Sequence, residues 1–379
     1  MPCKINEPQN QKTEYCARSR IKVHVGIHAV PPLPRIYDIG PRPAMPLDVM
    51  TLAVSVGIAA GSTWLCTAFA RSLLLRHRIL DKPGTRSSHS TSVPRGGGIA
   101  LVTIILIGWI ILSELGLGPM RQISVITSMA ALIAIVSWFD DVGNLSVRSR
   151  LSAQTIVVTI SILLVPTDFM LFGFLTHPLG MIVVGIAWIW FINVFNFMDG
   201  IDGITGVETI SICAGIALTL GFLGSGSYIS SLAIIVAAST LGFLGWNWHP
   251  AKLFLGDVGS IPLGFLLGWL LISLAQEGEW AAAVILPSYY LVDASLTLIG
   301  RAVRLEPVWK AHRQHFYQRA VAGQLSHSQA TRAIVVTNIW LIACALVSTI
   351  IILPGLVGAF FGIVALLCYF RLVSQPVGS

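Results

Sequence analysis

The sequence carries little charge. Only 11% of its 379 residues are Asp, Glu, Lys or Arg, 55% are hydrophobic, and the mean hydropathy is +0.79. Soluble domains usually have about a quarter charged residues, so this composition excludes an ordinary soluble protein. Apolar runs follow one another at the length that a helix needs to cross a bilayer. We therefore expect an all-α, polytopic integral membrane protein with a single membrane-embedded domain at 45–379.

Paired cysteines and internal repeats are also lacking. The cysteines are scattered without a CxxC pair, and four of them lie in apolar runs (Cys66, Cys213, Cys344 and Cys368). This spacing excludes a disulfide framework and a cysteine-based zinc site. No repeat of domain size is visible, which counts against a transporter built from two duplicated halves.

The first 44 residues differ from the rest of the chain. They are polar, rich in proline towards their end and without a hydrophobic period. Such a segment is expected to be a disordered tail. The alternative is a misassigned start, with translation beginning at Met45 or Met50.

From Met50 onward we expect about eleven transmembrane helices, at 50–75, 99–115, 122–139, 152–167, 179–196, 206–223, 229–246, 260–275, 280–299, 332–353 and 355–370. Of the Lys and Arg residues after Met50, only Arg121 lies in a loop that follows an even-numbered span. Because Lys and Arg collect in cytoplasmic loops, the loops after odd-numbered spans should be cytoplasmic. The N-terminus should then be periplasmic and the C-terminus cytoplasmic.

The most unusual stretch is NVFNFMDGIDGI, which lies between two apolar runs and contains Asn193, Asn196, Asp199 and Asp202. Charge at the edge of a membrane segment is costly and usually marks a site. The two aspartates are three residues apart and would share one face of a helix. Carboxylates beside glycines are suited to a divalent metal ion with a bound phosphate.

Two further acidic motifs fall on the same predicted face. DDVGN holds Asp140 and Asp141 where a span ends, and the negative end of a helix disfavours acids there, which indicates a function rather than a solvated helix end. FLGDVGS places Asp257 among glycines, with Ser260 as the expected cap of the next span. A simple turn residue is the alternative for Asp257.

The remaining polar stretches are basic or isolated. One stretch, DKPGTRSSHSTSVPRGGG, ends in three glycines whose backbone could approach a phosphate. The other, AHRQHFYQR, places His312 and His315 on one expected helix face, with Arg313 beside them. A basic loop and a surface helix are the alternatives. Asp293 lies inside the ninth span, as a functional acid or as a partner of Arg301.

The motifs DDVGN, NVFNFMDGIDGI, FLGDVGS and HRQH, in this order, resemble those of the polyprenyl-phosphate N-acetylhexosamine-1-phosphate transferases. This family includes the phospho-MurNAc-pentapeptide translocase and the enzymes that start O-antigen and enterobacterial common antigen. The resemblance covers roughly 81–319. It implies a multi-helix enzyme of the bacterial inner membrane that transfers a sugar 1-phosphate from a UDP-N-acetyl sugar to undecaprenyl phosphate and releases UMP. It also implies Mg²⁺, with Mn²⁺ as an alternative, at a cytoplasmic-face site; no nucleic acid is expected, and a homodimer stays open.

The resemblance assigns roles to individual residues. The expected catalytic residues are Asp140, Asp141, Asp199, Asp202, His312 and His315; the expected substrate-binding residues are Arg86, His89, Arg95, Gly97, Asn193, Asn196 and Arg313; the expected metal ligands are Asp257 and Asp199. Asp140 is the candidate general base, with a covalent aspartyl intermediate as the alternative.

The chain departs from the common-antigen enzymes in two places. Asn144 stands where they have a third acid, and Gln314 replaces the inner histidine of their HxHH motif. HRQHFYQR looks like the O-antigen-initiating branch, whose sugars are GlcNAc, QuiNAc or FucNAc phosphates.

Two other classes of membrane protein would show different patterns. An ion-coupled transporter would place acids at the middle of the bilayer and polar residues on both faces. A CDP-alcohol phosphatidyltransferase would show DGxxAR, and no Ala-Arg follows Asp199 and Gly200.

Overall fold

The computed structural model describes residues 49–81, 92–143, 145–165, 177–308 and 312–374. These residues are almost entirely helical, as the composition predicted; the only paired strands among them are two of two residues each. The predicted boundary between 44 and 45 lies outside the described residues. The helices are α1 (Val49–Arg76), α2 (Gly98–Glu114), α3 (Met120–Gly143), α4 (Val147–Leu164), α5 (His177–Phe197), α6 (Ile204–Phe222), α7 (Tyr228–Asn247), α8 (Asp257–Leu274), η2 (Ala275–Glu279), α9 (Trp280–Ile285), α10 (Ser288–Val303), α11 (Phe316–Gly323), α12 (His327–Ser348) and α13 (Ile352–Val373).

Most of the predicted spans are single helices. Among the described residues, nine helices are long and apolar enough to cross a membrane, and α2 is a shorter apolar helix. The predicted ninth span, 280–299, is wrong as one helix, because it is divided between α9 and α10. The break falls at Pro287, which has no N–H to donate and whose ring disturbs the preceding turn. A kink precedes α9 at Gly278, whose φ of +99° favours glycine.

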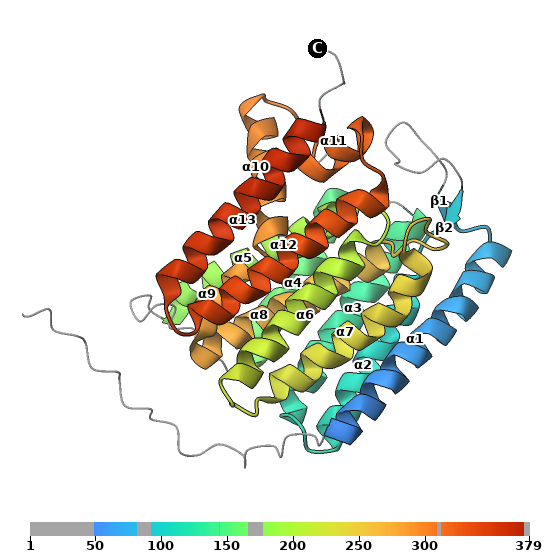
Figure 1. Ribbon diagram of the computed structural model, residues 1–379. Helices are drawn as coiled ribbons and strands as arrows, with labels where there is room; N and C mark the ends of the chain where they lie inside the picture. Colours follow the sequence, from blue (N-terminus) through green and yellow to red (C-terminus); the bar gives the residue numbers. More distant parts are fainter. Residues whose placement is uncertain (1–48, 82–91, 144, 166–176, 309–311, 375–379) are drawn as a thin grey trace, which may run out of the picture. The chain divides into compact units, whose positions relative to one another are not determined.

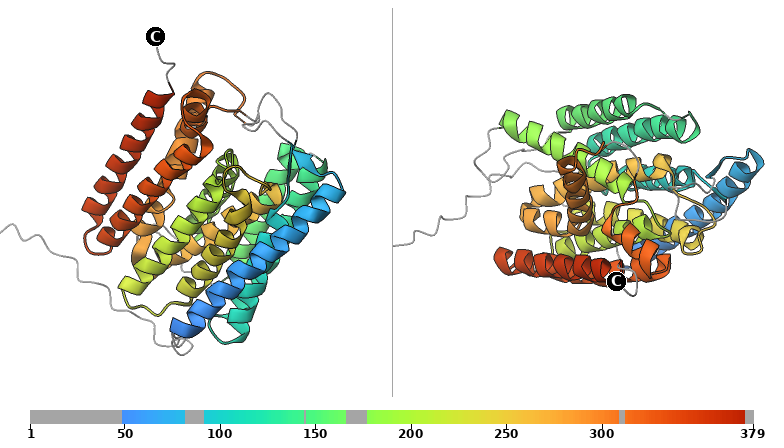
Figure 2. Two further views of the ribbon diagram at one scale, coloured as in Figure 1. Left: turned by 45° about the vertical axis from the view of Figure 1, so that its right-hand side comes forward. Right: turned by 90° about the horizontal axis from the view of Figure 1, so that it is seen from above.

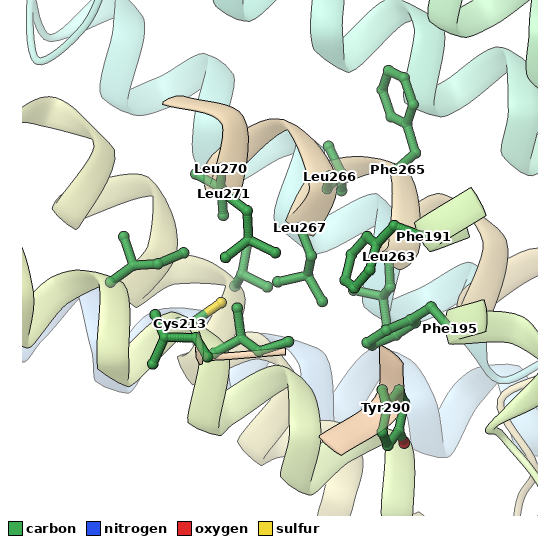
Figure 3. Close-up of a cluster of buried hydrophobic side chains, with 14 of the residues drawn as sticks. Phe191, Phe195, Cys213, Leu263, Phe265, Leu266, Leu267, Leu270, Leu271 and Tyr290 are labelled. Atoms are coloured by element: carbon green, nitrogen blue, oxygen red, sulfur yellow. The ribbon is translucent and has the colours of Figure 1, made fainter. Parts of the chain in front are cut away.

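Helix α8 lies at the centre of the bundle. In its most apolar window 89% of the residues are buried, against 17% for α1, which lies at one edge. Figure 3 shows its leucines packed against Phe191 and Phe195 of α5, Cys213 of α6 and Tyr290 of α10. A helix that is apolar all round is either enclosed by protein or faces lipid. Helix α13 is as apolar as α8, yet only 28% of the corresponding residues are buried, so the position of α8 follows from its neighbours and not from its composition.

The other helices surround α8. Figure 2 (left) shows α12 and α13 at one edge of the bundle and α1 at the opposite edge. The short helix α11 and the strands β1 (Leu80–Asp81) and β2 (Val93–Pro94) lie towards the same end of the bundle, the upper side of Figure 1. This is the end at which α3 and α5 finish and α8 begins, so the chain reversals that carry the acidic motifs meet there.

The beginnings of α2 and α8 are joined through their backbones. The N–H groups of Gly96 and Gly97 donate to the carbonyl of Phe254 at 3.2 and 2.9 Å, and Gly98 N–H donates to Leu255 at 2.9 Å. A Cβ atom on Gly98 would collide with the backbone of Gly259 in α8. Glycine is therefore required where these two backbones approach.

Candidate active site

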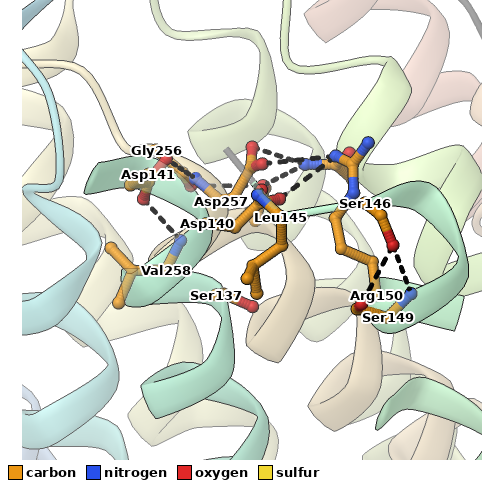
Figure 4. A network of polar contacts seen from close by, with 12 residues as sticks. Ser137, Asp140, Asp141, Leu145, Ser146, Ser149, Arg150, Gly256, Asp257 and Val258 are labelled. Carbon is orange, nitrogen blue, oxygen red and sulfur yellow. Dashed lines mark hydrogen bonds and ion pairs between the residues drawn. The ribbon is translucent and has the colours of Figure 1, made fainter. Parts of the chain in front are cut away.

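The carboxylate of Asp141 lies at the N-terminus of α8 (Figure 4). Its Oδ1 accepts a hydrogen bond from Asp257 N–H at 3.0 Å, and its Oδ2 accepts one from Val258 N–H at 2.9 Å. The first N–H groups of a helix lack partners within it and carry partial positive charge, so a carboxylate there is stabilised. The last turn of α3 thus caps α8, which confirms that the Asp140–Asp141 pair stands where a helix ends.

Arg95 connects the two aspartates. Its Nη2 lies 2.8 Å from Asp141 Oδ1 and 2.9 Å from Asp257 Oδ1. The arginine directly precedes the glycines that are bonded to Phe254 and Leu255, so the backbone holds it in place. Its side chain is 36% exposed, so part of it is accessible from solvent. Arg95, predicted to bind substrate, lies within the acidic cluster.

Arg150 is the second cation of the cluster, and sequence reasoning missed it. Its Nη1 lies 3.2 Å from Asp140 Oδ2 and 3.7 Å from Asp257 Oδ2 (Figure 4). Asp140 Oδ1 accepts a hydrogen bond from Leu145 N–H at 2.7 Å. Oδ2 of Asp140 is buried and accepts no hydrogen bond from the described residues. Its contact among the described residues is the ion pair with Arg150, so this oxygen can still accept a proton.

Asn196 holds Asp257 from the side of α5. Its Nδ2 donates to Asp257 Oδ1 at 3.1 Å and to Ser260 Oγ at 2.8 Å. Ser260 is not the cap that we predicted, because α8 already begins at Asp257 and Ser260 Oγ donates to the carbonyl of Gly256 one turn back. The cap is Asp141 instead.

Asp199 faces this cluster from the loop between α5 and α6. Its Oδ1 accepts a hydrogen bond from Thr205 Oγ1 at 2.6 Å. Burial raises the pKa of Asp199 to about 6, with the Thr205 hydrogen bond opposing the rise and the charge of Asp257 adding to it. The charges of Arg95 and Asp141 also act on it. Asp199 is therefore part of the same electrostatic unit.

Asp202 belongs to a different set of contacts. The segment 198–203 is not helical, so the prediction that Asp199 and Asp202 share a helix face is wrong. Asp202 Oδ2 lies 2.7 Å from His249 Nδ1, and its Oδ1 lies 3.3 Å from His327 Nδ1. Burial alone would raise the pKa of Asp202, but the two imidazoles outweigh it and the pKa is lowered. The glycines of the loop allow the two carboxylates to point to different partners.

The two predicted histidines lie before α11 rather than on one helix face. His315 is the N-cap of α11 and His312 precedes it, so the shared-face prediction is wrong. Their rings still pack, with centroids 4.9 Å apart. Burial lowers the pKa of His312 to about 4, and the neighbouring charges of His315 and Arg301 lower it further. His312 is therefore neutral at neutral pH.

Asp293 is fully buried and fixes His315. Its Oδ1 lies 3.3 Å from His315 Nδ1 and accepts a hydrogen bond from Phe316 N–H at 3.1 Å. The predicted partner, Arg301, instead pairs with Glu306 at 2.8 Å. The chain reverses after α10, which brings the beginning of α11, and not the end of α10, to Asp293.

Helix α11 in turn contacts the acidic loop. The hydroxyl of Tyr317, a residue that sequence reasoning missed, donates to the carbonyl of Met198 at 3.0 Å. A Cβ atom on Gly200 would collide with that hydroxyl. Asp293, α11 and the segment that holds Asp199 are therefore linked by direct contacts.

The other predicted residues have less direct relations to the cluster. Asn193 donates to Gln154 Oε1 at 2.6 Å, linking α5 to α4. Gly97 uses its N–H within the protein, so its role here is close packing: a Cβ atom would lie 2.5 Å from Leu253. Arg313 is partly buried beside His312. Arg86, His89 and Asn144 lie outside the described residues.

The cluster suits a hard divalent cation. Four carboxylates gather at the beginning of α8 and only two described cations, Arg95 and Arg150, pair with them. The donors are all oxygen atoms, which Mg²⁺ prefers, and Asp140 Oδ2 is buried without a hydrogen bond. The residues present therefore fit the metal that the family resemblance implies.

Comparisons with known proteins agree with this architecture. Residues 123–275 match the model of glycosyl transferase family 4. A Bacillus subtilis protein named "Probable undecaprenyl-phosphate N-acetylglucosaminyl 1-phosphate transferase" is 27% identical over 300 residues, 76% of this chain and 82% of that protein. The undecaprenyl-phosphate alpha-N-acetylglucosaminyl 1-phosphate transferase of Thermotoga maritima is 27% identical over 251 residues, 64% of this chain and 74% of its own.

A third relative has a different name. The phospho-N-acetylmuramoyl-pentapeptide-transferase of Streptococcus thermophilus is 27% identical over 277 residues, 66% of this chain and 79% of that protein. All three relatives are named as transferases, so the ion-coupled transporter alternative finds no support among them. The matched region runs from α3 to the end of α8 and contains Asp140, Asp141, Asp199 and Asp257. This chain is a polytopic membrane protein whose residues 123–275 are similar to glycosyl transferase family 4.

Proposed function

We propose that this protein transfers an N-acetylamino-sugar 1-phosphate from a UDP-sugar to undecaprenyl phosphate, which gives the lipid-diphosphate-linked sugar and UMP. The observation that carries the proposal is the cluster of Asp140, Asp141, Asp199 and Asp257 with Arg95 and Arg150 at the ends of apolar helices. A lipid phosphate keeps its chain in the bilayer and its headgroup at this level. The site is thus where it would meet a water-soluble nucleotide sugar.

The reaction is a phosphoryl transfer between two anions. An oxygen of the lipid phosphate attacks the phosphorus that bears the sugar, and the bond from that phosphorus to the bridging oxygen breaks. UMP leaves with the bonding electron pair. The approach of two anions costs Coulomb energy, which grows as the dielectric constant falls. The guanidinium groups of Arg95 and Arg150 reduce this cost and stabilise the charge of the transition state.

Asp140 is the residue that we assign as general base. Its Oδ2 accepts no hydrogen bond from the described residues, and the nearby Arg150 guanidinium stabilises the ionised carboxylate. The lipid phosphate is largely ionised at neutral pH, so the base has only a remaining proton to remove. Asp141 is already bonded to two N–H groups and to Arg95, so its part is to position α8.

The metal that we propose is Mg²⁺, with Mn²⁺ as an alternative. Asp257 would be the principal ligand and Asp199 the supporting one, because both face the same cluster. A bound Mg²⁺ would neutralise diphosphate charge and polarise the phosphorus–oxygen bond that breaks. Asn196 would hold Asp257 in position for this role.

We also propose that the site faces the cytoplasm at the bacterial inner membrane, because Lys and Arg collect in the loops on that side. The run from His312 to Arg319 favours an O-antigen or related envelope polysaccharide as the product. His312 and Arg313 lie in the segment before α11 and would contact the sugar nucleotide there.

The test is a reaction with purified protein. Protein in detergent is incubated with undecaprenyl phosphate and UDP-GlcNAc, UDP-QuiNAc or UDP-FucNAc, and UMP release and lipid-linked product are both measured. We expect one donor to give equal amounts of both products. Release of UMP without lipid product would indicate hydrolysis, and no release with any donor would contradict the proposal.

A second measurement separates the two mechanisms. Labelled UMP is added with UDP-sugar but without lipid. A covalent aspartyl intermediate predicts that label returns to the UDP-sugar under these conditions. Direct attack with Asp140 as the base predicts no exchange until the lipid product is supplied.

A further inference from the structure

A second polar cluster lies apart from the Asp257 carboxylates. Asp202, His249 and His327 come from the loop after α5, the segment after α7 and the beginning of α12. One ligand atom from each lies within 4.8 Å of the other two, a spacing at which all three could reach one metal ion. Figure 1 shows that the ends of α7 and α12 that meet here come from separate hairpins.

The carboxylate of Asp202 has no partner with a fixed positive charge among the described residues. Its ion-pair partners there are the two imidazoles, at 2.7 Å for His249 and 3.3 Å for His327. Asp202 is 7% exposed. A buried carboxylate is costly unless it is paired or coordinates a metal, so a cation at this position would compensate for the burial.

The same ring nitrogen of His327 faces the carboxylate. Nδ1 lies 3.3 Å from Asp202 Oδ1 and 3.4 Å from the backbone nitrogen of Asp202. Neutral imidazole nitrogens are the commonest metal ligands in proteins, so His327 and Asp202 together offer a nitrogen and an oxygen to one ion.

The surrounding contacts hold these groups in position. Ala251 N–H donates to Asp202 Oδ2 at 3.1 Å, and the Thr331 hydroxyl donates to the Asp202 carbonyl at 3.1 Å. Hydrogen bonds of this kind fix metal ligands in orientation. The His249 side chain is 38% exposed, so an ion has a path from solvent and room for a water ligand.

We propose that Asp202, His249 and His327 bind a first-row transition metal ion, Zn²⁺ first among them. Two imidazole nitrogens and one carboxylate oxygen are typical of Zn²⁺ sites, whereas Mg²⁺ takes oxygen ligands. The site would tie the loop of Asp202 to α12 and to the segment that leads to Asp257. The site shares no ligand with Asp257 or Asp199. Asp202 is also among the expected catalytic residues, so the test below measures metal binding and needs no substrate.

The experiment measures metal binding directly. Full-length protein with a tag free of histidine is purified in detergent, stripped with a chelator and titrated with Zn²⁺ and with Co²⁺. We expect the protein to bind one ion per chain. Bound Co²⁺ should give a visible absorption band, and Zn²⁺ should raise the thermal unfolding temperature. A hundredfold excess of Mg²⁺ should not displace the ion.

Variants decide where the ion binds. His249→Gln and His327→Gln keep an amide that can donate to Asp202 but offer a poor ligand, so each should weaken binding by more than about a hundredfold, beyond what loss of an outer contact costs. His77→Ala removes an exposed histidine at the end of α1 and should bind as the unchanged protein does. Ions bound by other histidines or cysteines should be present equally in the unchanged protein and in the three variants, so they cancel in the comparison.

Two results would overturn the proposal. One is stripped protein that binds no Zn²⁺ or Co²⁺ at micromolar concentration. The other is binding that is equal in His249→Gln, His77→Ala and the unchanged protein. In either case the cluster is a hydrogen-bonded contact between three segments. Because His249 is partly exposed, its replacement should not prevent folding, and its unfolding temperature without metal is the check.

Discussion

Asp141 caps the helix that begins at Asp257, with both carboxylate oxygens bonded to the first N–H groups of α8. This contact joins the first acidic motif to the third across the bundle. Loss of a cap costs about 1–2 kcal/mol. We expect Asp141→Ala to lower the free energy of unfolding by this amount and also to reduce turnover, since Arg95 and Asp257 lose their common partner.

A cap elsewhere provides the control. Ser146 caps α4 by accepting a hydrogen bond from Ser149 N–H at 3.1 Å, in an exposed position. Ser146→Ala should cost comparable stability while UMP release stays unchanged. Both variants are compared by thermal unfolding in detergent and by initial rate. Unchanged activity in Asp141→Ala would show that the cap is not needed to position Asp257.

Asp257 is the predicted metal ligand. Asp257→Asn keeps the size of the side chain but removes its charge, so it should lose at least about a hundredfold in rate, as when one key electrostatic stabiliser is removed. The Mg²⁺ concentration that gives half-maximal rate should rise. UMP release measured against Mg²⁺ checks this, and a normal rate with normal Mg²⁺ dependence would reject Asp257 as the ligand.

Asp293 and His315 should behave as one unit. Asp293→Asn weakens several hydrogen bonds in a fully buried place, so we expect a loss of about 2 kcal/mol in the free energy of unfolding. The rate of UMP release should fall much less than it does in Asp257→Asn. The double variant with His315→Ala should be less destabilised than the sum of the single ones, because they share one interaction. With Arg301→Gln, which lacks that contact, the effects should add.

The pKa of Asp199, raised to about 6, predicts a pH dependence. If the ionised form supports the reaction, activity falls as the pH drops through about 6. Thr205 donates a hydrogen bond that favours the ionised form. Thr205→Val should therefore raise the pKa further and move the acid limb of kcat/KM upward by about one pH unit, since one unit is 1.36 kcal/mol. If the acid limb of kcat/KM stays at the same pH in Thr205→Val, ionisation of Asp199 does not control the pH dependence.

The orientation of the bundle gives the fifth prediction. A reporter fused after Arg319, in α11, should be cytoplasmic, and one placed between Gly224 and Tyr228, in the turn from α6 to α7, should be periplasmic. The Lys and Arg asymmetry is the reason. Equal reporting from both positions would contradict the predicted arrangement of spans.

Hydrophobic length and motif order predicted much of this fold. The apolar runs placed ten of the eleven spans on single helices, and the shared face of Asp141 and Asp257 followed from the alternation of the loops. The break at Pro287 was missed because the apolar run continues through it; the proline itself is a sign of a helix end or kink, and the hydrophobic length outweighed it. Ser260 was expected to cap α8, since serine is a common cap. The capping carboxylate instead comes from Asp141 in α3, and a cap from a distant helix leaves no pattern in the local sequence.

The partners of the site residues were the least predictable part. Arg150 resembles any cation of a cytoplasmic loop until α4 brings it to Asp140. Glu208 lies unremarked in an apolar run, although it is fully buried in α6 and accepts a hydrogen bond from Asn338 of α12 at 2.7 Å. His249 and His327 are 78 positions apart, and neither belongs to a local metal-binding motif. Contacts of this kind depend on which helix ends meet, and local spacing does not contain that information.

The contact between Gly98 and Gly259 is needed for activity but not for insertion into the membrane. A methyl group at either position would act as a wedge between α2 and α8. It would change neither the hydrophobic length of a span nor the charge of a loop, so the chain would still insert with the same topology. The wedge would nevertheless part Arg95 from Asp257 by about the width of a carbon atom, enough to spoil a charged site at its working distances. Insertion tolerates such a change. The alignment of Arg95 with Asp257 does not, because it requires that Gly98 and Gly259 each carry only a hydrogen atom in place of a side chain.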